Sequence, residues 1–301
     1  MTTSRDILQA KTRFKRFLSF SAVDQFSTCE RRYFFERIMG QRQPDTPITL
    51  VGRTYHEAIA AMLHTRLERT DEWVELVVGE AVTRNHDALT AQGVQCGSLR
   101  AEMVSNLKRL RTDVLAPVGV TTLDAVAPYG RKRSWWIERD FSDEALGYKG
   151  VIDLLSLRVP VVDTHGTVTG GTDGRCVWDW KSVTFDRRRS QRDAETSAQL
   201  ALYALAANVR RACFVEIPRN LEKDLRVRVV TYTEQDLRDW AQWLGAMRDA
   251  ILARGRRKVN FRPADRKSPL CSPIWCPWYV TKCYPADSLL TPTTEEVTVE
   301  A

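Results

Sequence analysis

The feature that most constrains the fold is the tetrapeptide Trp178-Asp179-Trp180-Lys181. Side chains repeat every two residues along a strand, so Asp179 and Lys181 share one face. The apolar neighbours Val177 and Val183 predict a buried strand, where two unpaired charges would be costly. Such a pair is typical of a hydrolytic site, in which the carboxylate holds a hard cation and the ammonium orients a water or steadies negative charge. A surface strand with alternating charges is the other interpretation of the triplet.

A second acid, Asp153, follows Gly150 on the preceding apolar run. Between the two runs, residues 163–174 are rich in Gly, Thr and Asp, which predicts a hairpin loop. If this loop joins antiparallel strands, Asp153 and Asp179 converge on one divalent ion. Carboxylate oxygens suit hard cations, so we expect Mg²⁺ or Mn²⁺.

Two further side chains are candidates for this site. His56 lies on a predicted helix over residues 52–68, where an imidazole would favour Mn²⁺, and the alternative is a helix-surface residue. Glu138, on the strand before Gly150, is either a further acid at the site or an exposed strand residue.

Composition and charge indicate the kind of partner and the cellular location to expect. The chain has 301 residues and a formal charge of +7, which favours an anionic partner such as nucleic acid. No apolar run reaches the roughly 20 residues that span a bilayer, and the N-terminus lacks a signal-peptide core, so we expect a cytoplasmic protein without membrane contact. In a reducing compartment, the seven cysteines favour metal binding or buried thiols over disulfides. The sequence has no Gly-x4-Gly-Lys-[Ser/Thr] loop, which argues against a built-in motor.

The periodicity predicts helices first and strands later. We expect a basic arm over residues 1–17, a helix after Ser21, a break with Pro44 and Pro47 as stops, and an acidic, disordered tail over residues 286–301. Further helices are predicted at 72–91, 98–115, 193–209 and from Thr233 to Gly255, and strands at 135–138, 148–159, 176–183, 214–217 and 226–231. We therefore predict one domain over residues 18–285, with a helical insertion at 48–116, a catalytic core at 135–232 and a C-terminal helix with clustered cysteines at 233–285.

Three cysteines, Cys271, Cys276 and Cys283, lie close together among prolines and tryptophans. Clustered cysteines in a short segment usually bind a metal or an iron–sulfur cluster, and a fourth thiolate must come from elsewhere in the chain. By contrast, Cys176 and Cys213 lie in predicted strands, where we expect buried apolar thiols.

A run of arginines follows the Asp179 strand: Arg187, Arg188, Arg189 and Arg192. Beside the predicted metal site, these guanidinium groups are expected to bind phosphates. A solvated charged face is the alternative interpretation.

Taken in order, these motifs resemble the RecB-like branch of the PD-(D/E)XK nucleases, which includes Cas4 and AddB-type nuclease domains. The matching positions are Ser19-Phe20-Ser21 with Cys29 and Tyr33, Gly52-x3-His56, Glu138, Gly150-x2-Asp153, Asp179-x-Lys181, Gln199-x3-Tyr203 and the C-terminal cysteines. The resemblance implies an α/β fold, in which a mixed central sheet of the restriction-endonuclease type is flanked by helices, with an N-terminal helical insertion and a cysteine-cluster staple.

The resemblance also implies roles for these residues. His56, Asp153, Asp179 and the backbone carbonyl of Trp180 would bind Mg²⁺ or Mn²⁺, and Lys181 would orient the attacking water or stabilise the transition state, with Glu138 as a further catalytic acid. Gln199 and Tyr203 share a helix face that would hold the DNA strand. A core aromatic is the alternative for Tyr203.

For the cysteines, the resemblance implies a [4Fe–4S] cluster that joins the N-terminal helix to the C-terminus through Cys29, Cys271, Cys276 and Cys283. The family usually shows Cys-x2-Cys-x5-Cys, whereas this chain has Cys-x4-Cys-x6-Cys. The looser spacing leaves zinc open as the alternative.

The implied function is a metal-dependent deoxyribonuclease that cleaves single-stranded DNA or DNA ends as an exonuclease, with family precedent for 5′→3′ polarity. It would act in recombination, repair, phage DNA metabolism or CRISPR spacer processing, in a bacterial cytoplasm or that of a phage host. Homo-oligomers and recombination or CRISPR proteins are the expected protein partners. The alternative is a non-catalytic DNA-binding adaptor, which has no need for the His, Asp, Asp and Lys set. A cysteine-metal redox protein is disfavoured by the positive charge and the acid–lysine strand.

Overall fold

The computed structural model describes residues 17–41, 43–65, 70–129, 134–144, 147–183, 190–255 and 258–264, and also Cys271, Cys276, Trp278, Tyr279 and Cys283. The chain forms two compact units. The first includes Ser21–Pro44 and the chain from Met247 onward, and the second comprises Phe17–Phe20 and Asp45–Ala246. Apart from Phe17, the predicted basic arm lies outside the described residues, and so does the predicted acidic tail.

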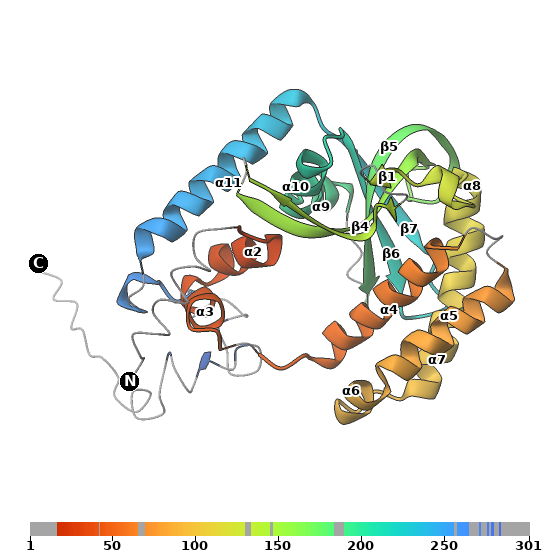
Figure 1. Cartoon of the computed structure of the whole chain (residues 1–301), viewed down its shortest axis with the longest axis horizontal. Helices are drawn as coiled ribbons and strands as arrows, with labels where there is room; N and C mark the ends of the chain where they lie inside the picture. The colour runs from red at the N-terminus through yellow and green to blue at the C-terminus, as the bar shows by residue number, and fades with distance from the viewer. Residues whose placement is uncertain are drawn as a thin grey trace, which may run out of the picture. The chain divides into compact units, whose positions relative to one another are not determined.

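The second unit is built on a mixed sheet of five strands in the order β3-β4-β5-β6-β7. The strands are β3 Ile137–Asp143, β4 Tyr148–Val162, β5 Val168–Val183, β6 Arg211–Pro218 and β7 Arg226–Thr231. Only β5 and β6 are parallel. Their crossover contains α9 Gln191–Glu195 and α10 Ala198–Ala206 (Figure 1), as a parallel connection requires. A separate two-stranded ladder joins β1 Pro128–Tyr129 to β2 Ser134–Trp135. The predicted α/β fold with a mixed, helix-flanked sheet is confirmed.

One face of the sheet packs against the helices that precede it in the chain. These are α4 Pro47–Leu63, α5 Asp71–Arg84, α6 His86–Ala91, α7 Cys96–Arg109, η2 Leu110–Leu115, α8 Ala116–Val118 and η3 Leu123–Ala125 (Figure 1). The main contacts with the strands come from α4, α8 and η3, and α5, α6 and α7 pack chiefly on other helices. Their apolar side chains form one core with Trp178, Trp180 and Val215 of the sheet. Because strand side chains alternate, Asp179 and Lys181 point away from this core, toward the face that contacts α10.

Two predicted boundaries are wrong for local reasons. Pro47 was expected to stop a helix, but it is the first residue of α4, where a proline loses no hydrogen bond. Thr46 caps this helix, because its Oγ1 accepts the Thr49 N–H at 3.3 Å and Thr49 Oγ1 accepts the Thr46 N–H at 2.8 Å. The predicted helix over 193–209 is interrupted before Ser197, whose side chain caps α10.

The predicted loop over 163–174 is also too long, because β5 begins at Val168. The turn is closed by Asp163, whose Oδ1 accepts the N–H groups of His165 and Thr167, each at 2.8 Å. Gly166 has a φ of 86°, and its carbonyl accepts the Val227 N–H at 2.8 Å, so the hairpin tip is fixed to β7. The remaining glycines of the segment belong to a strand.

Gly171 shows why glycine occurs within this strand. A Cβ there would lie 2.2 Å from the Val118 carbonyl oxygen, whereas a Cβ at Gly170 would meet nothing within 4 Å. We expect Gly171→Ala to lower the free energy of unfolding by about 1–3 kcal/mol, because backbone must move to admit the methyl group. Gly170→Ala is the matched control, with an expected change below about 0.5 kcal/mol. Urea denaturation of both variants checks this, and equal midpoints would contradict the packing explanation.

The first unit combines α2 Phe20–Thr28, α3 Glu30–Tyr33 and η1 Phe34–Ile38 with the end of α11 Glu234–Arg254 and with η4 Lys258–Asn260. Arg254 donates to both carboxylate oxygens of Glu30 at 2.8 Å. The Phe34 and Phe261 rings pack with centroids 5.1 Å apart. These contacts join the early helices to the segment that follows α11. Within the described ranges, no helix has both the length and the apolar character needed to cross a membrane.

Candidate active site

The site lies where β4 and β5 separate. The ladder between them ends at Leu154 and Trp178, and beyond this pair β5 remains paired only with β6 among the described strands. The Trp180 N–H, which has left the β4 ladder, donates to Asp153 Oδ2 at 2.8 Å. The edge of β4 that β5 leaves is taken by Leu18, whose carbonyl accepts the Lys149 N–H at 2.8 Å. The separation therefore opens a gap in the sheet that is lined by polar groups.

Three ligand-type side chains meet in this gap. His56 Nδ1 lies 2.8 Å from Glu138 Oε1 and 3.6 Å from Asp153 Oδ1. Its Nε2 lies 3.2 Å from the Trp180 carbonyl oxygen. Across the part of the chain that the structure describes, His56, Glu138 and Asp153 are the only three such residues whose donor atoms all lie within 4.8 Å of one another. Helix α4 and strands β3 and β4 thus each contribute one group to the same point.

Glu138 reaches this point through an unusual backbone conformation. Ile137 pairs with Leu154 and Arg139 with Ile152, which sets Glu138 opposite Asp153. Its φ of 43° is in the left-handed region, which non-glycine residues rarely occupy and which costs about 1–3 kcal/mol. Its carboxylate thus lies next to His56 and Asp153.

The acidic side chains of the site shift the pKa values of their neighbours. Burial of the imidazole lowers the pKa of His56, but the carboxylates of Asp153, Glu138 and Asp179 outweigh it and raise the pKa to about 9. Burial raises the pKa of Asp153, the charge of Asp179 raises it further, and His56 opposes both. The cluster has more negative charge than its basic side chains neutralise, which is the condition that favours a bound cation.

Lys181 lies beside Asp179, as the alternation predicts. Its Nζ is 2.7 Å from Asp179 Oδ2, and it donates to Gln199 Oε1 at 3.0 Å. Asp179 is only 1% exposed, so this ion pair is formed in a largely dry environment. The ammonium also lies 5.8 Å from the centroid of the Phe214 ring. Lys181 is therefore held at a defined position next to the acids.

Gln199 links the lysine, the acid and the helix α10. Its Nε2 donates to Asp179 Oδ1 at 2.7 Å and to Tyr203 Oη at 3.2 Å. Gln199 and Tyr203 lie one helical turn apart, so they share the face that meets the site. Tyr203 is 7% exposed, and burial raises the pKa of its hydroxyl. It is thus partly a core aromatic, with its hydroxyl turned to Gln199.

Phe141, which no sequence motif indicates, packs edge-on against Tyr203 with ring centroids 6.0 Å apart. A Cβ at Gly150 would lie 3.0 Å from the Tyr203 ring and 3.1 Å from the Phe141 ring. The glycine of the Gly150-x2-Asp153 motif therefore makes room for both rings. Nothing in the local pattern around Phe141 signals this contact, because it depends on the pairing of β3 with β4.

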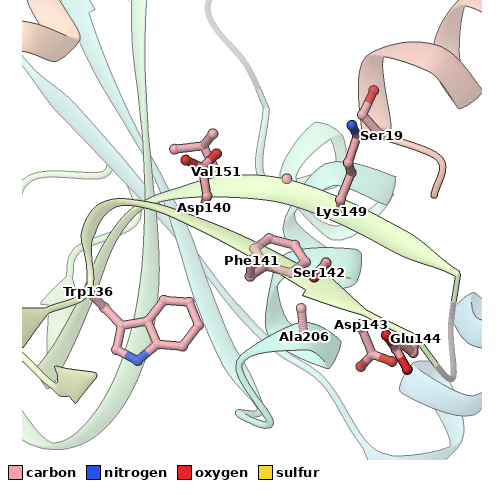
Figure 2. A pocket seen from close by; sticks show the side chains of 11 residues that line it. Ser19, Trp136, Asp140, Phe141, Ser142, Asp143, Glu144, Lys149, Val151 and Ala206 are labelled. Carbon is pink, nitrogen blue, oxygen red and sulfur yellow. The ribbon is translucent and has the colours of Figure 1, made fainter. Parts of the chain in front are cut away.

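A cavity of about 820 Å³ lies beyond Phe141, along the β3–β4 hairpin (Figure 2). Asp140, Asp143 and Glu144 line it with a single lysine, Lys149. Phosphates would be repelled by this excess of carboxylates. Of the arginines predicted to bind phosphates, Arg187, Arg188 and Arg189 lie outside the described residues. Arg192 is an exposed residue of α9.

The cysteines divide as the sequence predicts into buried and clustered groups. Cys176 and Cys213 are fully buried in β5 and β6, with their sulfur atoms 4.0 Å apart. In the first unit, Cys29 Sγ accepts the N–H groups of Arg32 at 3.4 Å and Ala264 at 3.3 Å. Burial raises the pKa of Cys276 and of Cys283, and the charge of Cys29 contributes to both shifts. Cys29, Cys276 and Cys283 therefore lie near enough to interact.

Comparisons with known proteins show the family of this chain. Residues 17–280 match the model of the PD-(D/E)XK nuclease superfamily, so the chain belongs to that superfamily. A crystal structure from Eubacterium rectale, named “Putative exonuclease”, shares the fold with a TM-score of 0.52 at 13% sequence identity. The match covers 90% of this chain and 92% of the Eubacterium rectale chain. No curated protein matches the sequence. Membership makes this chain a nuclease-type protein, and members of the superfamily use divalent metals.

Proposed function

We propose that the protein is a metal-dependent deoxyribonuclease that acts as an exonuclease on single-stranded DNA or DNA ends. The observation that carries the proposal is the gap between β4 and β5, where His56, Glu138 and Asp153 converge beside the Asp179–Lys181 pair. A non-catalytic adaptor would have no use for so costly an arrangement, since buried charges are retained only when paired or functional.

The residues in the gap fit a hard divalent cation. Asp179 Oδ2 is buried and ion-paired with Lys181 Nζ at 2.7 Å, and a carboxylate oxygen in such a pair keeps a further lone pair for a metal. The donor set of carboxylates, one imidazole and the Trp180 carbonyl is typical of Mg²⁺ or Mn²⁺. We propose His56, Asp153, Asp179 and the Trp180 carbonyl as ligands, with Glu138 as a further acid. When bound, the ion would supply charge neutralisation and a water of lowered pKa.

The chain's own groups then account for positioning and charge. Lys181 carries a fixed positive charge next to the acids, where it can donate a hydrogen bond to the attacking water or to a non-bridging phosphate oxygen as negative charge develops. Gln199 holds Lys181 and Asp179 in one arrangement through its two amide atoms. Glu138 accepts from the His56 ring and so fixes its orientation. Tyr203, next to Gln199, is proposed to contact the DNA strand.

For the first unit we propose a [4Fe–4S] cluster held by Cys29, Cys271, Cys276 and Cys283. The N–H groups directed at Cys29 Sγ suit a thiolate, which accepts such bonds in cluster sites. Tetrahedral zinc needs sulfur atoms within about 4 Å of one another at a Zn–S distance of about 2.3 Å. Zinc bound by the same four thiolates is the alternative, and metal analysis distinguishes it from a cluster.

Digestion of end-labelled single-stranded DNA tests the proposed activity. We expect cleavage with Mg²⁺ or Mn²⁺ and none in EDTA. Mononucleotides released first from a 5′-labelled strand would indicate the 5′→3′ polarity that the resemblance implies, and release from a 3′-labelled strand would indicate the opposite. Unchanged cleavage in EDTA, or DNA binding with no cleavage under any metal, would refute the proposal in favour of another mechanism or of an adaptor. The pathway, whether repair, recombination, phage DNA metabolism or CRISPR spacer processing, remains a proposal from the resemblance.

A further inference from the structure

A second concavity of the nuclease unit is rich in arginine. A cavity of about 700 Å³ is lined by Arg175 of β5, Arg210 and Arg211 at the start of β6, and Tyr232 and Glu234 near the start of α11. An adjoining cavity of about 430 Å³ shares Arg210 and Glu234 with it and adds Arg238. Together these form what we call the arginine groove, with four arginines and one glutamate.

The charge of this groove is only partly neutralised. Glu234 pairs with Arg210, and its other oxygen lies 3.7 Å from Arg238. Arg175 and Arg211 have no carboxylate within ion-pair distance among the residues that the structure describes. The groove therefore presents guanidinium groups that are free to bind an anion. Guanidinium groups bind phosphate oxygens in a two-point geometry, which makes phosphate the best-matched anion.

The backbone makes room for one of these arginines. Gly174 has a φ of 144°, which L side chains rarely adopt, and a Cβ there would lie 2.9 Å from Arg211 Nη1. The missing side chain leaves the space in which the Arg211 guanidinium lies over β5. Beneath the groove, Tyr232 is 3% exposed, and its Oη makes no hydrogen bond within the described ranges. A buried hydroxyl without a partner is costly, and a ligand oxygen that reached it would remove this cost.

The groove lies at a defined distance from the proposed cleavage site. Arg175 and Asp179 are both on β5 and four residues apart, which corresponds to about 13 Å at about 3.3 Å per residue. Phosphates of a stacked strand are spaced about 3.4 Å apart, so along a stacked strand the groove is about four nucleotides from the scissile phosphate. It is thus outside the site already described, but within reach of the same strand.

We propose that the arginine groove binds the phosphate backbone of the DNA strand about four nucleotides away from the bond that is cleaved. This proposal rests on the proposed function, because it takes DNA as the ligand. It also agrees with the acidic cavity beyond Phe141, which would repel a strand leaving on that side. The groove would supply affinity and a preference for longer strands without taking part in the chemistry.

The test compares Arg175→Gln/Arg211→Gln with a matched control, Arg84→Gln/Arg100→Gln. The control arginines line a concavity on α5 and α7, but together with Glu75 and Glu80. Binding of a fluorescein-labelled single-stranded 20-mer is measured by anisotropy in EDTA, at several salt concentrations. We expect the groove variant to bind roughly 10-fold more weakly, with a salt slope reduced by about 1.4, because each phosphate contact contributes about 0.7 on single strands. The control variant should match the wild type.

Strand length provides a second readout. The groove variant should show a raised KM with an unchanged kcat on the 20-mer, but wild-type kinetics on a trimer that is too short to reach the groove. Equal affinity and salt slope in the wild type and the groove variant would overturn the proposal, and so would an equal loss in the control. A wild type that binds DNA in a groove-dependent way but cleaves none would overturn only the proposed catalysis, because the binding assay contains no metal. Charge reversal at both positions, Arg175→Glu/Arg211→Glu, should weaken binding further, and circular dichroism confirms that each variant is folded.

Discussion

Lys181→Ala is expected to reduce the rate of DNA cleavage by about 10²- to 10³-fold, the cost of removing one positioned donor from a developing negative charge. The structure gives the reason, because Lys181 Nζ is held by Asp179 at 2.7 Å and by Gln199 at 3.0 Å. The loss should appear in kcat, since the lysine acts in the transition state. Single-turnover cleavage of a labelled strand measures it.

DNA affinity in EDTA should change little in the same variant, because one lysine among many basic groups contributes little to binding. Lys149→Ala is the matched control, since Lys149 is an exposed lysine of β4 in the acidic cavity. This variant should cleave at the wild-type rate. Full activity in Lys181→Ala would contradict the assigned role, and equal losses in the two variants would indicate a general effect of charge.

Cys276→Ser should remove the proposed iron–sulfur cluster. A hydroxyl of nearly the same size is a poor replacement for a thiolate, so we expect iron to fall from about four atoms per chain to near zero, with loss of the broad absorption near 400 nm. The first unit should lose stability as well, since ligand binding to the folded state is folding free energy. Iron analysis and thermal unfolding of anaerobically purified protein measure both effects.

Cys96→Ser provides the control for this experiment. Cys96 is half-buried at the start of α7 and lies outside the proposed cluster. Iron content and melting temperature should match the wild type. Unchanged iron in Cys276→Ser would show that Cys276 is not a ligand, and one zinc per wild-type chain in place of iron would refute the cluster.

Local pattern predicted the parts of the site that depend on strand alternation. Trp178 and Trp180 face the helical core, so Asp179 and Lys181 must face the other side. The convergence of Asp153 with Asp179 required only that their strands pair antiparallel, which they do. The facing of these side chains and the antiparallel pairing were predicted correctly because burial fixes the register of a strand.

The missed features depend on contacts between distant segments. Position 171 of β5 is a glycine because the Val118 backbone lies against it. No local rule separates such a glycine from a glycine in a turn. Phe141 and Leu18 reach the site region only through the pairing of β4 with its neighbours. The left-handed backbone of Glu138 is likewise imposed by its surroundings, since the intrinsic preference of glutamate opposes it.

Manganese binding tests the central claim, that the separated strands β4 and β5 hold a divalent cation beside Lys181. Electron paramagnetic resonance would follow Mn²⁺ bound to Lys181→Ala protein with single-stranded DNA present, because this variant is expected to cut the strand only slowly. We predict a bound Mn²⁺ that is lost in the further variant Asp153→Asn and retained in Asp140→Asn, a control on the neighbouring strand that lies outside the site. Unchanged Mn²⁺ binding after Asp153→Asn would contradict the account.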